Sequence, residues 1–147
     1  MTATPPERIF HIATAADWRR ALDSGSYTTS TVGRSLAEEA FIHASRRDQV
    51  QGVFDRYYRG LGEPLVLLTI DTTRLGDAEV VVEPVGDDTY PHVYGPINRT
   101  AVVDVAPLDR RGGTETLMSL WISGMAVRMG IALAVMALVT VVVLVLS

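Results

Sequence analysis

The pattern of hydrophobic and polar residues predicts short strands and helices that follow one another without a regular repeat. Residues 8–13 form an apolar first strand. Apolar residues then recur at helical spacing between Thr14, a favourable N-cap, and Gly25, a favourable stop, so a helix is expected there. The polar residues 26–34 predict a loop that is too polar to be buried and long enough to act as a lid over a neighbouring site.

The middle of the chain carries a short helix and a long apolar strand. Ser35 and Glu38 have the spacing of a capping box, which predicts one or two helical turns. Residues 65–70 are a nearly continuous apolar run of strand length and predict a central strand.

A second helix is expected after Ser45, because Ser45 and Asp48 again have the spacing of a capping box. Val50 and Tyr57 lie on one face of this helix, with Val53 or Phe54 between them. An amphipathic helix of this kind buries its apolar face against a sheet.

The last part of the domain predicts two more strands, over residues 78–84 and 100–105. Between them, residues 90–96 contain two prolines and a glycine, which predict a rigid loop. Strands and helices alternate without the spacing of a doubly wound fold. We therefore expect an α+β fold with a mostly antiparallel, split sheet and two or three helices.

The composition changes after Pro107. Residues 108–116 are a polar linker, and residues 130–146 form an unbroken uncharged run. With Met129 added, a helix over about residues 129–146 approaches the ~30 Å thickness of a bilayer core, so a C-terminal transmembrane helix is predicted. Arginines precede this helix and no basic residue follows it, so we expect a single-pass membrane protein whose N-terminal domain is cytoplasmic.

The expected organisation is a flexible N-terminus over residues 1–7, one domain over 8–107, the linker, and a membrane-associated segment over 117–147. Residues 1–7 have neither the basic start nor the apolar core of a signal peptide. Residues 117–128 either span the membrane with the helix or lie along its surface, and the sequence leaves both open. A length of 147 residues has room for one folded domain.

Charge and cysteine content exclude several kinds of site. The chain has no cysteine, so it has no disulfide, thiolate nucleophile or thiolate metal site. All 13 basic residues are arginine and the net charge is -4, which argues against nucleic-acid binding through bulk electrostatics. Local arginine pairs remain candidates for binding anions.

One such pair stands at the start of the predicted second helix. Ser45 as an N-cap would turn the first amide groups of the helix outward, and such an end attracts anions. Arg46 and Arg47 add formal charge at the same place, and His43 directly precedes it. The alternative is a well-capped helix whose two arginines face solvent.

The three histidines lie in compact aromatic or apolar settings. They are found in Phe10-His11-Ile12, in Phe41-Ile42-His43 and in Tyr90-Pro91-His92-Val93-Tyr94-Gly95-Pro96. Together with Trp18, Gly25-Ser26-Tyr27, Ser35-Leu36, Ala44-Ser45, Gln49 and Glu83, these segments resemble, in the same order, the bacterial family catalogued as domain of unknown function 952. The resemblance covers roughly residues 8–107. Ala40 and Ala44 depart from it, because the family often has Gly and Cys at these positions.

This family resembles, at the level of fold, the ADP-ribosyltransferase-like group, whose members bind a nicotinamide dinucleotide in the cleft of a split antiparallel sheet. The resemblance implies a nucleotide-type small-molecule ligand, with NAD as a substrate or ligand, and ADP-ribosyl transfer or NAD glycohydrolase activity. The cofactor itself is left unknown. Fold alone does not decide function.

Cleavage of such a ligand needs a contact to the ribose, cations for the pyrophosphate, an aromatic face for the base and a carboxylate for a developing oxocarbenium ion. His11 is the candidate ribose contact, and Glu83 is the candidate catalytic carboxylate. The pyrophosphate site is assigned to Ser45 with Arg46 and Arg47. The stacking face for the base is assigned to Tyr27 or Tyr94. His43 and His92 are further catalytic candidates without a settled role in this scheme.

Three alternatives stay open. A non-catalytic sensor would bind a nucleotide or a phosphorylated metabolite through the same pocket without any reaction. His11, His43 and His92 could instead bind zinc with one open coordination position, although no two of them have a spacing typical of ligands. The histidines could also be structural, with their rings hydrogen-bonded at the ends of strands.

Overall fold

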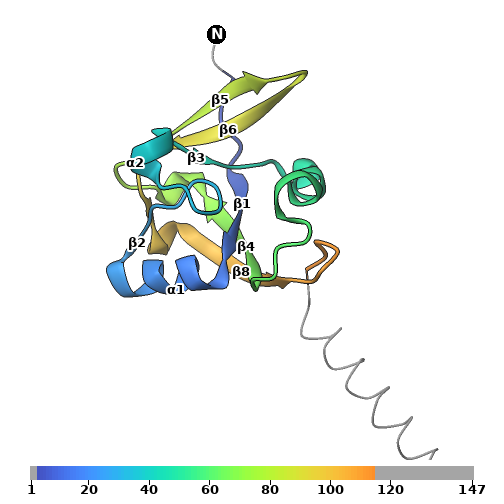
Figure 1. The fold of residues 1–147 in the computed structure, drawn as a ribbon. Coiled ribbons are helices and arrows are strands. Elements are labelled where there is room, and N and C mark those ends of the chain that lie inside the picture. The colour runs from blue at the N-terminus through green and yellow to red at the C-terminus, as the bar shows by residue number, and fades with distance from the viewer. Residues whose placement is uncertain (1–2, 115–147) are drawn as a thin grey trace, which may run out of the picture. The chain divides into compact units, whose positions relative to one another are not determined.

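The computed structural model describes residues 3–114, and it shows an α+β domain with antiparallel sheets and three α-helices, as the sequence predicted (Figure 1). The predicted transmembrane helix over residues 129–146 lies outside the described residues, as does the rest of the segment 117–147. Between residues 3 and 114, no helix is both long and apolar enough to cross a bilayer.

The first sheet contains the long apolar strand that the sequence predicted. It has the order β1-β4-β8, and all pairs are antiparallel; its strands are β1 (Arg8–Thr14), β4 (Leu65–Asp71) and β8 (Val102–Leu108). The central position of β4 explains its apolar sequence, because both of its edges and both of its faces are covered. The last strand begins later than the predicted residue 100, since Arg99–Ala101 form a 3-10 turn.

Two further antiparallel sheets complete the architecture. The order β3-β6-β5 joins β3 (Ile42–His43), β6 (Asp88–Tyr94) and β5 (Glu79–Val85), while β2 (Ser26–Tyr27) pairs with β7 (Ile97–Asn98). In Figure 1 the β5–β6 hairpin lies at one end of β1, and α1 lies at the other.

The rigid loop predicted over residues 90–96 is mostly strand β6, so this prediction was wrong. Two prolines and a glycine were the reason to expect a loop, since proline is rare inside a central strand. Here the carbonyl of Pro91 accepts a hydrogen bond from the N–H of Ala44, on the side of β3. The nitrogen of Pro91 points to that same side, because the N and C=O of one strand residue share a side. Strand β3 has already ended there, so the hydrogen bonds between β6 and β5 do not need an N–H from Pro91, and this ladder is intact.

Both predicted helix starts before residue 40 are confirmed. Helix α1 (Ala15–Ser24) begins at Thr14, whose side chain accepts the N–H of Asp17, and it ends at Gly25 in the left-handed conformation. The short helix α2 (Leu36–Glu39) has the predicted capping box: Glu38 accepts the N–H of Ser35, and the Ser35 hydroxyl accepts the N–H of Glu38.

The predicted N-cap at Ser45 was wrong. Ser45 is in a β-bridge with Phe10, and its N–H and carbonyl both pair with that residue. The helical segment starts one residue later, with the side chain of Gln49 accepting the N–H of Arg46. It consists of a 3-10 turn, α3 (Val50–Val53) and a π-helical turn over Phe54–Tyr58. Arg46 is itself still extended (φ -72°, ψ 163°), so no helical residue follows Ser45 directly and Ser45 cannot be the cap.

The buried face of this segment also differs from the prediction. Val50 and Phe54 are buried as expected, but the third buried residue is Tyr58, while Tyr57 is 58% exposed. In a π-turn the hydrogen bond runs from residue i+5 to i, here from Arg59 to Phe54. The extra residue in the turn places Tyr58, four residues after Phe54, on the buried face.

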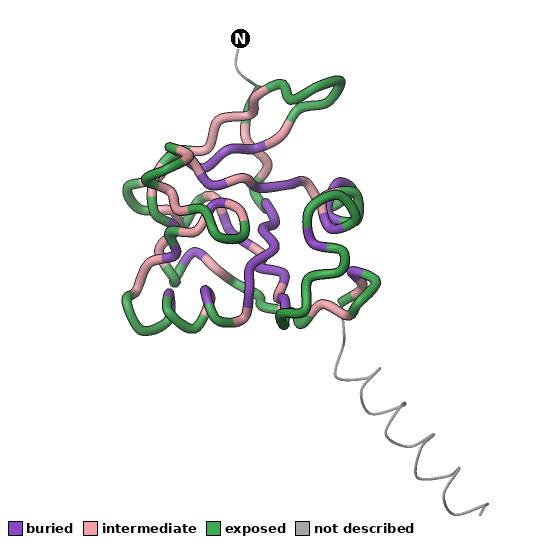
Figure 2. Tube along the Cα trace, viewed as in Figure 1, coloured by how far each residue is buried: buried purple, intermediate pink, exposed green. Residues whose placement is uncertain are grey.

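Strand β1 is buried on both faces and divides the core in two, as the buried stretch at the centre of Figure 2 shows. Ile9 packs with β4 and the β3–β6 region, while Phe10 packs with Phe54 and the segment around it. Tyr27 and Ser30 are almost completely buried, so the prediction that residues 26–34 are too polar to be buried was wrong at these two positions; the other seven residues are intermediate or exposed. Short pairing of β2 with β7 carries Tyr27 into the core.

Candidate functional site

The segment over residues 42–45 connects the two three-stranded sheets and thereby gathers the histidines. At one end His43 pairs with His92 of β6, and at the other Ser45 pairs with Phe10 of β1. His11 follows Phe10 by one residue, so its side chain is close to the same junction. Three histidines that are far apart in the sequence are brought together by two antiparallel pairings.

A cavity of about 470 Å³ opens at this junction. Four of the predicted site residues line it: His11, His43, Ser45 and His92. Its volume is in the range typical of small-molecule sites, roughly 300–1,000 Å³. The structure therefore offers one place in which the histidines could act together.

Within this cavity wall, His11 has both ring nitrogens occupied by the protein. Its Nδ1 donates to the carbonyl of His43 (2.6 Å), and its Nε2 accepts from the hydroxyl of Tyr27 (2.9 Å). Burial lowers the pKa of His11 to about 4, and burial also raises the pKa of the Tyr27 phenol far above its usual range. The ring is therefore neutral, with its proton on Nδ1, and both of its nitrogens are already hydrogen-bonded.

His92 is equally buried but has only one nitrogen bonded. Its Nδ1 lies 2.5 Å from Oε2 of Glu83, while its Nε2 is buried without a hydrogen-bond partner in residues 3–114. The ring stacks on Phe41, with centroids 4.1 Å apart, and meets the ring of His43 edge-on at 5.2 Å. The orientation of the His92 side chain is thus fixed on three sides.

His43 has a carboxylate partner of its own. Its Nε2 lies 3.4 Å from Oε2 of Glu39, at the end of α2. Burial lowers the pKa of His43, the Glu39 carboxylate raises it, and His92 lowers it further, with a net decrease. Glu39 also accepts a hydrogen bond from the hydroxyl of Thr31 and pairs with Arg34. Two histidine–carboxylate pairs therefore stand side by side.

Glu83, predicted to act directly on a ligand, lies outside the set of residues that line the cavity. Its Oε2 accepts hydrogen bonds from His92 and from the hydroxyl of Tyr94 (2.7 Å). These two bonds, that of Tyr94 first, lower the pKa of Glu83. Tyr94 likewise does not line the cavity, and Tyr27 lies behind His11 in the core.

The predicted pyrophosphate arginines lie outside the cavity as well. Arg46 donates to the carbonyl of Thr89 and pairs with Asp88, and it thereby fastens the β5–β6 hairpin to the start of the helical segment. The guanidinium of Arg47 lies over the ring of Phe10. Of the predicted anion site, only Ser45 lines the cavity.

Two other arginines, which the sequence analysis did not single out, line the cavity instead. Arg34 belongs to the loop before α2, and Arg56 belongs to the π-helical turn, where its guanidinium lies over Tyr57. The aromatic residues of the wall were also missed; they are Tyr57, Tyr58 and Tyr90. Glu39, the carboxylate partner of His43, was missed as well, although its spacing of four residues from His43 is that of neighbours on a helix and could have indicated it.

The geometry of residues 3–114 does not favour the three-histidine zinc site. No group of three or more histidine, aspartate or glutamate side chains in this part of the chain is arranged to hold a metal ion. The reason lies in the hydrogen bonds, since His11 uses both nitrogens on protein partners and His92 uses Nδ1 on Glu83.

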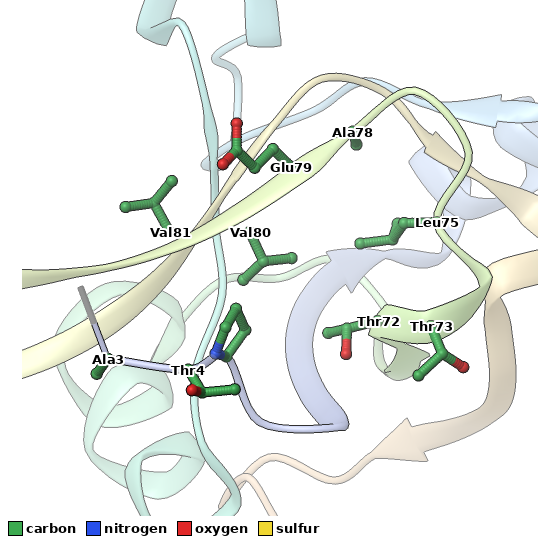
Figure 3. A pocket seen from close by; sticks show the side chains of 10 residues that line it. Ala3, Thr4, Thr72, Thr73, Leu75, Ala78, Glu79, Val80 and Val81 are labelled. Atoms are coloured by element: carbon green, nitrogen blue, oxygen red, sulfur yellow. The ribbon is translucent and has the colours of Figure 1, made fainter. Parts of the chain in front are cut away.

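A second cavity, of about 540 Å³, lies where the N-terminal residues pass beside β5 (Figure 3). Side chains from the N-terminal segment, from the turn after β4 and from β5 surround it, among them Thr4, Thr72 and Val80. Its wall contains no histidine or arginine, and its one ionisable side chain is Glu79. All three histidines line the other cavity, at the junction of the two three-stranded sheets.

Comparisons with known proteins agree with the resemblance seen in the sequence. A crystal structure of protein CC0527 from Caulobacter crescentus is similar, with 30% identity, a TM-score of 0.61, and coverage of 74% of this chain and 93% of that chain. The solution NMR structure of CC0527 from the same organism is 28% identical over 73% of this chain and 90% of that one, with a TM-score of 0.53. No curated protein matches. The family model described as "Protein of unknown function (DUF952)" matches residues 12–105, which is more than half of the chain, and the chain therefore belongs to the DUF952 family.

Proposed function

We propose that this domain binds a nicotinamide dinucleotide or ADP-ribose-type ligand in the histidine cavity. The observation that carries the proposal is the composition of the cavity wall: two arginines, three tyrosines, three histidines and the carboxylate of Glu39 around one space. Arginine binds phosphate groups with charge-assisted hydrogen bonds, and tyrosine rings offer faces for a base. The wall thus contains the groups that a nucleotide diphosphate needs.

The arrangement of charge within the wall supports the same class of ligand. Arg56 is exposed and has no acidic partner within residues 3–114, so an anion is free to bind it. The guanidinium of Arg34 lies 3.5 Å from Oε1 of Glu39, a carboxylate that Thr31 and His43 also contact. The pyrophosphate would lie beside these two arginines, with the sugar and base further inside, near His43 and His92.

We also propose that the fold of this domain is related to that of the ADP-ribosyltransferase-like group. The support for this relation is the antiparallel architecture, in which a short segment joins two sheets beside the cavity. We also propose, from the sequence over residues 129–146, that a transmembrane helix tethers the domain on the cytoplasmic side of a membrane. Sedimentation of the full-length chain with membranes after carbonate extraction tests the tether, and recovery in the soluble fraction without detergent contradicts it.

A sensor that binds without a reaction is the second candidate function. One observation favours it: the carboxylate assigned to catalysis, Glu83, bonds to His92 and Tyr94 instead of lining the cavity. Binding of the ligand is common to both candidates, so binding is the property to test first.

The test compares two arginines that are alike except for their location. Arg47 and Arg56 are both exposed, and each lies over an aromatic ring, but only Arg56 lines the cavity. Calorimetric titration of the full-length chain in mild detergent with ADP-ribose, NAD and pyrophosphate should show binding. Arg56→Gln should weaken it by about 1–3 kcal/mol if a charge-assisted contact is lost.

Arg47→Gln is the matched control and should leave the affinity unchanged. If Arg47→Gln weakens binding and Arg56→Gln does not, the pyrophosphate lies at the helix start that the sequence predicted, and the cavity is the wrong site. If none of the three compounds binds to the wild-type chain, the proposed function is overturned.

A further inference from the structure

The unpaired nitrogen of His92 is unusual in this fold. Of all buried side-chain nitrogen and oxygen atoms in residues 3–114, it alone has no hydrogen-bond partner. Buried polar groups in native proteins are nearly always paired, and an exception calls for an explanation. His92 also lines the cavity, so the unpaired atom belongs to a residue of the proposed ligand site.

The contacts of His92 determine which of its nitrogens carries the proton when the ring is neutral. Glu83 accepts a second hydrogen bond, from Tyr94, and its lowered pKa keeps it ionised at neutral pH. An ionised carboxylate at Nδ1 holds the proton of a neutral imidazole on that nitrogen. Nε2 of His92 then carries an unshared electron pair and is a proton acceptor.

The hairpin register makes this arrangement specific. Glu83 on β5 stands opposite Tyr90, and His92 and Tyr94 follow at steps of two along β6, so all four side chains project from the same face. Phe41 covers one face of the imidazole and prevents it from rotating. A histidine whose Nδ1 is held by a carboxylate and whose Nε2 is free has the geometry of a general base.

We infer that His92 is the general base of this site, which takes a proton from water as the water attacks a bound nicotinamide dinucleotide, and that Glu83 is its positioning residue. The inference rests on the proposed function for its ligand. It gives Glu83 a role that fits its place behind His92, outside the cavity wall.

The reaction is a hydrolysis that needs no other reactant. A proton moves from water to Nε2 of His92, and a bond forms between the water oxygen and C1′ of the nicotinamide ribose. The bond from C1′ to the pyridinium nitrogen breaks, its electron pair stays on that nitrogen, and neutral nicotinamide leaves. His92 then loses its proton to solvent, so NAD⁺ and water give ADP-ribose, nicotinamide and one proton.

His43 favours proton uptake by its neighbour. Its ring lies 5.2 Å from that of His92, so a charged His43 would repel the imidazolium that forms. Burial lowers the pKa of His43, which keeps its ring neutral at neutral pH. Glu39, at Nε2 of His43, and Glu83, at Nδ1 of His92, supply negative charge on the two outer sides.

The experiment measures NAD binding and the release of nicotinamide and ADP-ribose by the full-length chain in detergent. His92→Asn keeps an amide donor near the position of Nδ1 and removes Nε2, so kcat should fall about 10²- to 10⁴-fold with little change in the Kd for NAD. Glu83→Gln should lower kcat to a similar extent with KM unchanged, and Glu83→Asp should restore part of the loss. Glu79→Gln, which removes the same charge from an exposed position on β5, is the control and should leave kcat unchanged.

The outcomes separate this inference from the function on which it depends. If wild type binds NAD but releases no nicotinamide, the general base is overturned and the binding function stands. Turnover by His92→Asn at the wild-type rate overturns it as well. If wild type binds no dinucleotide at all, both proposals fail. A lower melting temperature with kcat unchanged in either variant assigns His92 and Glu83 to the stability of the hairpin alone.

Discussion

His11 and His92 are two buried histidines in the same cavity wall, and their surroundings are opposite. His11 is 3% exposed and His92 is 5% exposed. His11 gives one nitrogen to the carbonyl of His43 and the other to the hydroxyl of Tyr27, whereas His92 gives one to Glu83 and leaves the other unpaired. Burial alone therefore does not distinguish the two histidines. They differ in the number of nitrogens that the protein itself satisfies.

The two regions also differ in what holds them. His11 lies on β1, which is covered on both faces, and its partners are a main-chain carbonyl and a core phenol. His92 lies on a hairpin, and its carboxylate partner is partly exposed to solvent. We expect the first region to contribute mainly to stability and the second mainly to function, and three experiments test this contrast.

The largest effect should come from His11→Ala. The change leaves the His43 carbonyl and the Tyr27 hydroxyl without partners and opens a cavity in the core, so unfolding free energy should fall by about 3–5 kcal/mol. His92→Ala loses one hydrogen bond at a partly exposed carboxylate and should cost less, about 1–3 kcal/mol. Denaturant unfolding of both variants measures the difference. Equal losses at the two positions would break the comparison.

A somewhat smaller effect should appear as a pH dependence of stability. Burial lowers the pKa of His11 from 6.5 to about 4 in the folded state, so between these values the unfolded chain binds a proton that the folded chain does not. Stability from this residue is therefore full above pH 6.5 and is lost as the pH falls toward 4. At roughly 1.4 kcal/mol for each pKa unit, the loss amounts to about 3 kcal/mol.

The range of pH distinguishes this effect from that of the carboxylates. His43, whose pKa is also lowered, adds to the loss with the same sign. Asp88 titrates lower, because hydrogen bonds from Gln49, from the N–H of Thr89 and from Arg46 bring its pKa to about 2. Unfolding free energy measured between pH 7.5 and 4.5 should therefore fall steadily. A flat profile from pH 7 to pH 5 would show that His11 is not buried in its neutral form.

The smallest effect should come from Tyr27→Phe, which gives His11 the same hydrogen-bonding state as His92. Removing the phenol leaves Nε2 of His11 buried and unpaired while Nδ1 keeps its bond to His43. The expected loss is about 1–2 kcal/mol of unfolding free energy. Tyr94→Phe is the control, since its hydroxyl bonds to Glu83 at the exposed rim, and it should change stability by less than about 0.5 kcal/mol. Similar values for the two tyrosines would remove the distinction between core and rim.

Several elements were determined by the sequence over short distances. The caps of α1 and the capping box of α2 involve residues three or four positions apart, so their partners are visible in the sequence itself. The apolar run of β4 needed no partner to be recognised, because length and composition identify a buried strand. Order and type of the segments that carry the three histidines were sufficient to indicate the family.

Other elements were decided by contacts between distant segments. Tyr27 is buried because β2 pairs with β7, some 70 residues later in the chain. The residues around Pro91 form a strand because the nitrogen of Pro91, which has no hydrogen to donate, lies on the side of β6 where strand β3 has already ended. Ser45 is held by Phe10 and cannot cap the helix. Local propensity was overridden in each case by pairing that only the folded chain makes possible.

The candidate site divides in the same way. The sequence indicated the three histidines, Ser45 and Glu83 as candidate site residues, because rare titratable residues in apolar settings stand out in a chain with three histidines and no cysteine. Only the tertiary structure decided that Arg34 and Arg56 line the cavity in place of Arg46 and Arg47, and that His92 keeps a nitrogen free while His11 does not. The physical reason is that strand register and side-chain hydrogen bonds join residues that lie 9, 16 or 32 positions apart, and no pattern of neighbouring residues encodes which partner each atom will find.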